Sequence, residues 1–271
     1  MSTAEPSAPL TRRDARRARR EGAESRSRGW GVFLRDVVVI VLIALLVSFL
    51  VKTFVVRSFY IPSGSMENTL QVDDRILVDE LTPRFTDYQR GDIVVFRDPG
   101  GWLEGQAPAP SKGTFVDGVE WVLSLVGLAA PDSSDHLIKR IIGLPGDHVV
   151  CCNALDQIEV NGVPLEESAY VKLAPGQKMP SVVPFDVTVP ADSFWVMGDN
   201  RDRSRDSRYN QDQPAKGFVP SEDVVGRAFL RTWPFDRFGG LGTTGDSFAG
   251  VPDSESENEP SDDPSPEATA G

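Results

Sequence analysis

An uninterrupted apolar segment near the N-terminus constrains this chain more than any other feature. Residues 37–51 read VVVIVLIALLVSFLV, and the apolar stretch extends over residues 32–56 with charged residues only near its ends. About 20 such residues cross a bilayer as a helix, and long charged side chains at the ends reach the interface. The segment is therefore predicted to be a transmembrane helix.

Two other interpretations of this segment are less consistent with the sequence. A buried core helix is one, but the unbroken apolar circumference over this length favours a membrane span. A cleaved signal peptide is the other, and it would end in a small-x-small site, whereas KTFVVR follows at residues 52–57. We expect an uncleaved anchor over residues 32–56.

Charge is distributed unevenly along the chain, whose formal net charge is −12. Residues 1–30 hold eight Arg and four acidic residues, while residues 251–271 hold seven acidic residues and no basic one. An Arg-rich flank is typical of the cytoplasmic side of a membrane span. We expect residues 1–31 to be a disordered cytoplasmic segment. The chain after the anchor is then extracytoplasmic at the plasma membrane, and no nucleic-acid partner is expected.

Composition divides the rest of the chain into a folded domain and a tail. Residues 57–238 carry the patterned apolar residues and form the expected domain. Within it, residues 100–135 are rich in Gly, Pro and small residues, which indicates a loop-like insertion; its apolar stretch at 119–130 could be a core or an interfacial helix. Residues 239–271 are rich in Gly, Ser, Pro and acidic residues, so we expect a disordered tail.

Short runs of β-branched and aromatic residues dominate the expected domain. Turn signals separate them, including Pro145-Gly146-Asp147 and the hairpin-type pair Asn161-Gly162. The patterns predict a mainly β fold, with an antiparallel β-sheet domain after the single N-terminal helix. The expected strands are 75–79, 92–96, 136–142, 148–150, 157–160, 193–197 and 224–231.

Histidine and cysteine are too scarce for most kinds of site. His136 and His148 are the two histidines, and each lies in a strand-like run that favours an ordinary surface or core histidine over a catalytic base. Cys151 and Cys152 are adjacent, so they form either a vicinal disulfide or two thiols in a turn, with no base marked beside them. We expect no metal site and no cofactor.

A serine activated by a lysine is the remaining way to build a nucleophile. Ser63 and Ser65 lie in a turn shortly after the apolar segment, and Lys139 lies inside an apolar strand-like run. Burial can lower the pKa of a lysine until its neutral amine acts as a base. A lysine that reaches outward to solvent is the alternative. The other lysines lie at the membrane edge or in polar segments: Lys52, Lys112, Lys172, Lys178 and Lys216.

Residues 198–208 form a third cluster, GDNRDRSRDSR, directly after an expected strand. Its three Asp and four Arg indicate an ion-paired loop, which could be purely structural or could line a site.

Four ordered blocks, at 61–70, 91–96, 139–147 and 198–208, together resemble the bacterial type I signal peptidases, also called leader peptidases, the Ser/Lys dyad family. The resemblance extends from the anchor to about Trp233. A related family of self-cleaving repressors is soluble and would lack the anchor and the last block.

The resemblance implies roles for individual residues. Ser65 matches the nucleophile and Lys139 the general base. Ser63 matches a hydroxyl that forms the oxyanion hole with the Ser65 backbone N–H, and Ser204 matches a hydroxyl that orients the lysine amine. Structural ion pairs near the site are implied for Arg140, Asp206 and Arg208.

It also implies an activity: removal of N-terminal signal peptides from exported preproteins, with cleavage after small residues at −1 and −3. An extended substrate could add as a strand to a sheet edge. The implied enzyme needs no metal or cofactor, works at the phospholipid membrane and is expected to be a monomer. A rival hypothesis is a non-catalytic anchored β-domain that binds extended segments of envelope proteins, in which Ser65 and Lys139 would tolerate Ala.

The chain departs from the family pattern at three places. Asn68 stands where the family often has Pro, and Asp73 replaces a common Gly. The cysteines are adjacent, so a disulfide between separated cysteines cannot be transferred.

Overall fold

The computed structural model describes residues 30, 32–48, 56–81, 85–103 and 135–254. Contacts divide the chain into two units, Met1–Thr53 and Phe54–Gly271. In the first unit, residues 32–48 are helical. Within the described ranges, no helix combines the length and the apolarity needed to cross a membrane. The expected anchor continues through residues 49–55, which lie outside the described residues.

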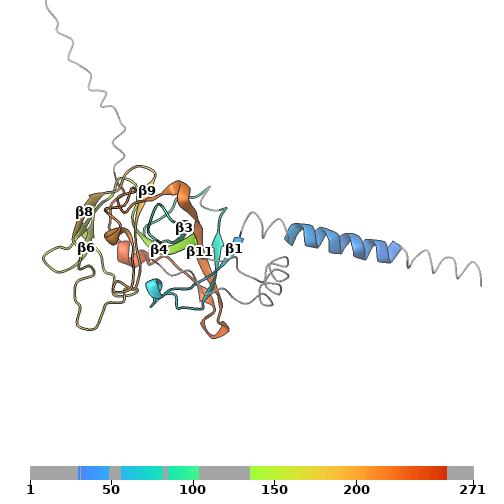
Figure 1. The fold of residues 1–271 in the computed structure, drawn as a ribbon. Helices are drawn as coiled ribbons and strands as arrows, with labels where there is room; N and C mark the ends of the chain where they lie inside the picture. Colours follow the sequence, from blue (N-terminus) through green and yellow to red (C-terminus); the bar gives the residue numbers. More distant parts are fainter. Residues whose placement is uncertain (1–29, 31, 49–55, 82–84, 104–134, 255–271) are drawn as a thin grey trace, which may run out of the picture. The chain divides into compact units, whose positions relative to one another are not determined.

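The second unit is built from two antiparallel sheets (Figure 1). One has eight strands in the order β1-β2-β11-β3-β4-β9-β10, with β12 paired to β11, and the other has four in the order β7-β6-β5-β8. The mainly β prediction is therefore confirmed. The strands are β1 Val56–Tyr60, β2 Arg75–Asp79, β3 Ile93–Arg97, β4 His136–Gly143, β5 His148–Cys151, β6 Ile158–Val160, β7 Val163–Pro164, β8 Phe185–Thr188, β9 Ser193–Met197, β10 Val219–Pro220, β11 Val224–Trp233 and β12 Gly239–Gly240.

All seven strands expected from the sequence are present, with ends shifted by at most two residues. The Asn161-Gly162 turn also forms as predicted. Val160 pairs with Val163, so Asn161 and Gly162 are the whole hairpin loop. Their φ angles are 52° and 77°. Both are positive, as a tight hairpin turn requires, and Asn and Gly adopt such angles at little cost.

Strand β4 lies inside the large sheet and determines where the site forms. It pairs with β3 on one side and β9 on the other, and every residue from Leu137 to Gly143 is buried. A strand covered on both faces reads as a continuous apolar run. Lys139 and Arg140 interrupt that run, and both are nevertheless buried.

The expected boundary of the tail at residue 239 is wrong. Residues 239–240 form β12, and a short 3₁₀ helix, η7, covers Gly245–Phe248. Phe248 is buried in the core cluster beside the small sheet, and Ser254 Oγ donates a hydrogen bond to the Pro145 carbonyl at 2.8 Å. An apolar side chain within this polar stretch draws the chain back onto the domain.

The insertion expected at 100–135 is described only at its two ends. Trp102 is fully buried and packs edge-on against Phe96 at 5.6 Å, so it belongs to the core, and the partly buried Leu103 packs against the same cluster. The apolar stretch at 119–130 lies outside the described residues.

The departures from the family pattern fit the local backbone. Asn68 has a φ of 98° and Asp73 a φ of 73°. Proline is held near −65°, so it does not fit the conformation at residue 68, while the value at residue 73 is one that glycine adopts freely. Cys151 and Cys152 form a vicinal disulfide, which decides between the alternatives the sequence left open.

Candidate active site

The two candidate serines lie in a turn that is attached to the core by buried apolar side chains. Ser63 precedes η1, a 3₁₀ helix over Gly64–Met66 that follows the first strand. Met66 and Leu70 are fully buried, and the Leu70 N–H donates to the Met66 carbonyl at 2.7 Å. These apolar anchors point the turn into the domain, so Ser65 is also buried.

The structure brings Ser65 and Lys139 together. Lys139 Nζ lies 3.0 Å from Ser65 Oγ and donates to the Ile138 carbonyl at 2.9 Å. Both residues are about 5% exposed or less. Ser63 Oγ lies 3.3 Å from Ser65 Oγ. A hydroxyl, an amine and a second hydroxyl thus form one contact chain, which is buried at Ser65 and Lys139 and exposed at Ser63. The distance between Lys139 Nζ and Ser65 Oγ allows proton transfer.

The environment of Lys139 favours its neutral form. Desolvation by burial is the largest influence and lowers its pKa to about 8, with the Arg208 guanidinium acting in the same direction. The carboxylates of Asp206 and Asp199 partly oppose this effect. An amine with such a pKa is largely neutral at mildly alkaline pH, as a general base must be.

Ser204 is buried beside this pair. The Ser204 hydroxyl meets no partner with hydrogen-bond geometry among the described residues. It still lies near Asp206, and the pKa of that carboxyl is lowered. Desolvation by burial acts to raise the Asp206 pKa, but the Arg208 guanidinium, the Gly198 N–H and the Ser204 hydroxyl together outweigh it. A Cβ on Gly198 would lie 2.1 Å from Ser204 Oγ and 2.5 Å from the Ser65 carbonyl oxygen. Only glycine at residue 198 lets Ser204 come this close to the Ser65 turn.

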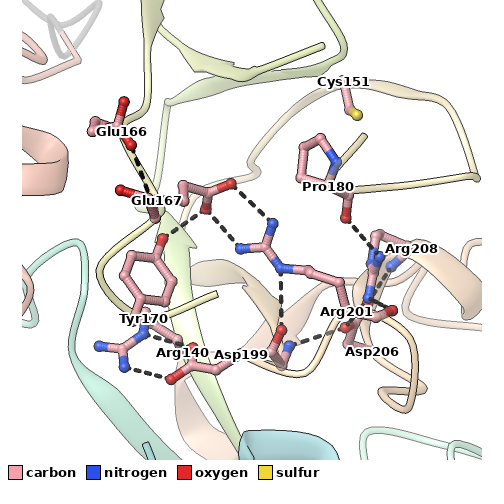
Figure 2. A network of polar contacts seen from close by, with 12 residues as sticks. Arg140, Cys151, Glu166, Glu167, Tyr170, Pro180, Asp199, Arg201, Asp206 and Arg208 are labelled. Carbon is pink, nitrogen blue, oxygen red and sulfur yellow. Dashed lines mark hydrogen bonds and ion pairs between the residues drawn. The ribbon is translucent and has the colours of Figure 1, made fainter. Parts of the chain in front are cut away.

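Three buried arginines near the site each form a bidentate ion pair with a carboxylate (Figure 2). A bidentate pair fixes the relative orientation of the guanidinium and the carboxylate in addition to pairing their charges. The closest N–O distances are 2.6 Å for Arg140–Asp199, 2.6 Å for Arg201–Glu167 and 2.8 Å for Arg208–Asp206.

Arg140, Asp206 and Arg208 all form ion pairs, but they do not form a single group. Arg208 pairs with Asp206, but Arg140 pairs with Asp199 and also donates to the Gly91 carbonyl at 2.7 Å. Arg140 follows the lysine on an alternating strand, so its side chain leaves the opposite face. It therefore reaches a different carboxylate of the 198–208 segment.

Sequence reasoning missed two residues of this network. Glu167 binds Arg201, and Tyr170 donates its hydroxyl to Glu167 at 2.6 Å while its ring lies under the Arg140 guanidinium at 4.4 Å. Both belong to an irregular segment between β7 and β8. This segment lacks the alternation of apolar and polar residues that indicates a strand, and an acidic residue near an aromatic one is too common to single out.

The other candidates examined in the sequence take different places. His148 is exposed and contacts Asp186 at 2.7 Å. His136 packs against the Phe59 ring at 5.3 Å, and desolvation by burial, followed by Arg57, lowers its pKa. Within the described ranges, no group of three or more His, Cys, Asp or Glu could hold a metal ion.

Comparisons with known proteins show which family the chain belongs to. The family model "Signal peptidase, peptidase S26" matches residues 34–233. A signal peptidase I of Mycobacterium tuberculosis is 40% identical over 222 residues, which is 76% of this chain and 74% of that protein. A probable signal peptidase I-2 of Synechocystis sp. is 38% identical over 189 residues, covering 70% of this chain and 68% of the relative.

A crystal structure of a signal peptidase I from Enterococcus faecalis V583 is 27% identical and covers 52% of this chain and 97% of its own, but its TM-score of 0.31 is too low for a structural argument. The family match and the two relatives span most of the chain, and this chain therefore belongs to the signal peptidase family, peptidase S26, and is a hydrolase of that family.

Proposed function

We propose that this protein is a membrane-anchored signal peptidase I in which Ser65 is the nucleophile and Lys139 the general base. The observation that carries the proposal is the 3.0 Å contact between Lys139 Nζ and Ser65 Oγ inside a buried site. The lowered pKa of Lys139, about 8, supports it because the amine must be neutral to accept a proton.

The reaction follows from these positions. Neutral Lys139 takes the proton of Ser65 Oγ as that oxygen attacks the scissile carbonyl carbon. The negative charge that develops on the carbonyl oxygen is stabilised by the Ser65 N–H and the Ser63 hydroxyl, donors worth about 3 kcal/mol each. Protonated Lys139 then gives its proton to the leaving amine, and a water activated by the same lysine releases the signal peptide from Ser65. Ser204 orients the amine.

An apolar hollow beside the site supports a preference for small residues. It is lined by two segments, 59–62 after the first strand and 136–138 at the start of β4, together with Val95. Strand β1 ends the order of the large sheet. An exported preprotein lying along this edge as an added strand would direct alternate side chains into the hollow. We propose cleavage after small residues at −1 and −3.

Membrane attachment is part of the proposal. We propose that residues 32–56 span the plasma membrane, with the Arg-rich N-terminus cytoplasmic and the β-sheet unit extracytoplasmic. Trp233, Phe235 and Phe238 are exposed, and Trp233 packs on Phe235 at 4.8 Å. Exposed aromatic residues of this kind favour the membrane interface. We propose a monomer that needs no cofactor.

The test is cleavage of a purified preprotein with an Ala-x-Ala site, in detergent with phospholipid. Wild type is compared with Ser65→Ala, Lys139→Ala and, as a control, the exposed Lys178→Ala. We expect cleavage after the small residue, seen as a new N-terminus by mass spectrometry, with wild type and Lys178→Ala only. Cleavage that survives Lys139→Ala would show that another group is the base. Binding without cleavage by folded wild type would favour a non-catalytic binding domain.

A further inference from the structure

Glu67 ends the turn that carries Ser65, and its side chain bends back over that turn. The Glu67 N–H donates to the Gly64 carbonyl at 3.2 Å. The carboxylate lies so close that a Cβ on Gly64 would be 2.7 Å from Glu67 Oε1. A charged group therefore covers the start of the turn.

Two residues from distant parts of the chain meet this carboxylate. Lys172 Nζ donates to Glu67 Oε2 at 2.7 Å, and Asn200 Nδ2 donates to the same oxygen at 3.2 Å. The side chain of Lys172 is 50% exposed and that of Glu67 is 23% exposed, so the ion pair lies at the surface. Asn200 lies beneath it and is buried.

Asn200 also holds the backbone of the turn. Its N–H donates to the Ser65 carbonyl at 3.0 Å, and Nδ2 donates to the Gly64 carbonyl at 3.1 Å. Lys172 is tied to the same loop, because its N–H donates to the Asp199 carbonyl at 2.8 Å and its carbonyl accepts from the Arg201 N–H at 2.9 Å. The Glu67–Lys172 pair thus joins the nucleophile turn to the loop that also carries Ser204.

We propose that Glu67 and Lys172 are positioning residues, which act through Asn200 to hold the Ser65 turn at its contact distance from Lys139. The inference rests on the proposed function. Proton transfer depends steeply on the placement of the reacting groups, so a turn with more freedom spends less time in the reactive geometry. Neither residue lines the hollow proposed to receive the substrate, so we expect the effect in kcat.

The experiment uses the full-length protein and a double-mutant cycle. Glu67→Gln, Lys172→Met and the double variant are compared with wild type in preprotein cleavage. Lys172→Arg keeps the charge and serves as the conservative rescue. Glu166→Gln and Lys178→Met are matched controls, because both residues are exposed and lie outside the pair.

We expect each single variant to lower kcat about fivefold, with KM unchanged. The double variant should lose no more than either single one, since both remove the same interaction. Lys172→Arg and the two controls should stay within about twofold of wild type. Equal activity of Glu67→Gln and wild type would overturn the proposal, as would a change confined to KM.

A second readout does not need turnover. Amide hydrogen exchange of peptides from residues 61–70 should be faster in Glu67→Gln and Lys172→Met, while the unfolding midpoint stays at the wild-type value. Unchanged exchange would overturn the positioning role even if activity fell. If wild type cleaved no preprotein, the proposed function would fail, and the exchange result would still decide whether the pair holds the turn.

Discussion

In the proposed mechanism, Lys139 accepts the Ser65 proton only after it has lost its own, so we expect its pKa to determine the acid side of the pH profile. Burial lowers that pKa to about 8, and the neutral fraction therefore rises with pH through this value. We expect kcat/KM to rise about tenfold per pH unit below pH 8 and to level off above it. The measurement is preprotein cleavage between about pH 6 and 10. The unfolding midpoint at each pH is the control, and a profile already level at pH 6 would exclude Lys139 as the base.

Gly198 offers a steric test at a single residue. A methyl group there would collide with both Ser204 and the Ser65 carbonyl, and the nearest of these atoms would be 2.1 Å away. Gly198→Ala must therefore push the serine turn away from the lysine, and we expect kcat to fall about 100-fold. Gly242→Ala is the control, because a Cβ at residue 242 meets nothing within 4 Å. Equal kcat values for the two variants would contradict the close packing at residue 198.

Sequence reasoning at the residue scale identified the residues of the contact chain but not all of their partners. A turn after the apolar segment indicated Ser65, a lysine inside an apolar strand-like run indicated Lys139, and a polar cluster after an expected strand indicated the 198–208 segment. Strand periodicity could not decide whether Lys139 faced solvent, because β4 is covered on both sides and alternation carries no signal there. The pairing of Arg140 with Asp199 depends on which face a side chain leaves, and the pattern of charges does not contain that information.

A buried ion pair between Arg201 and Glu167 is among the contacts that attach the irregular segment between β7 and β8 to the site. Arg201 is fully buried and Glu167 is nearly so. Desolvation by burial acts to lower the Arg201 pKa, but the Glu167 carboxylate more than compensates, so the Arg201 pKa is raised. Glu167→Gln leaves a buried guanidinium without its counter-charge, and we expect a loss of about 3–5 kcal/mol in the free energy of unfolding.

Urea denaturation of the full-length protein measures that loss. Asp186→Asn is the control, since Asp186 contacts His148 at the surface and its replacement should change stability by less than about 0.5 kcal/mol. Similar midpoints for the two variants would mean that water reaches Arg201.

Elements differ in how far the sequence predicts them. The seven strands with β-branched runs were found because each carries its own apolar pattern. Strand β1 was missed because Val56 still belongs to the apolar stretch assigned to the anchor. The two-residue strands β7, β10 and β12 have no pattern of their own and exist only where a longer neighbour supplies hydrogen bonds. Trp102 likewise is buried through long-range packing that a Gly-rich loop does not indicate.

At the scale of the whole molecule, the C-terminal segment connects the small sheet to the site. Phe248 packs in the core cluster of the small sheet, and its ring lies 3.2 Å from where a Gly91 Cβ would be. The Gly91 carbonyl accepts from Arg140, the residue after Lys139. The same segment returns to the domain at Arg90, which donates to the Pro252 carbonyl at 3.0 Å and pairs with Asp147.

Two truncations separate the packed segment from the acidic sequence that follows it. A chain ending at residue 254 keeps every one of these contacts, so its unfolding free energy and kcat should match those of the full-length protein. A chain ending at residue 244 loses Phe248 from the core, and removing a buried Phe side chain costs about 3–5 kcal/mol. We expect the second truncation to lose stability by about that amount and kcat as well, because the support beneath Gly91 and Arg140 is removed. Phe248→Ala in the full-length chain should reproduce most of the loss in stability and most of the loss in kcat. If stability and kcat stay at their wild-type values, the segment contributes through its backbone contacts near Arg90 and not through the buried ring.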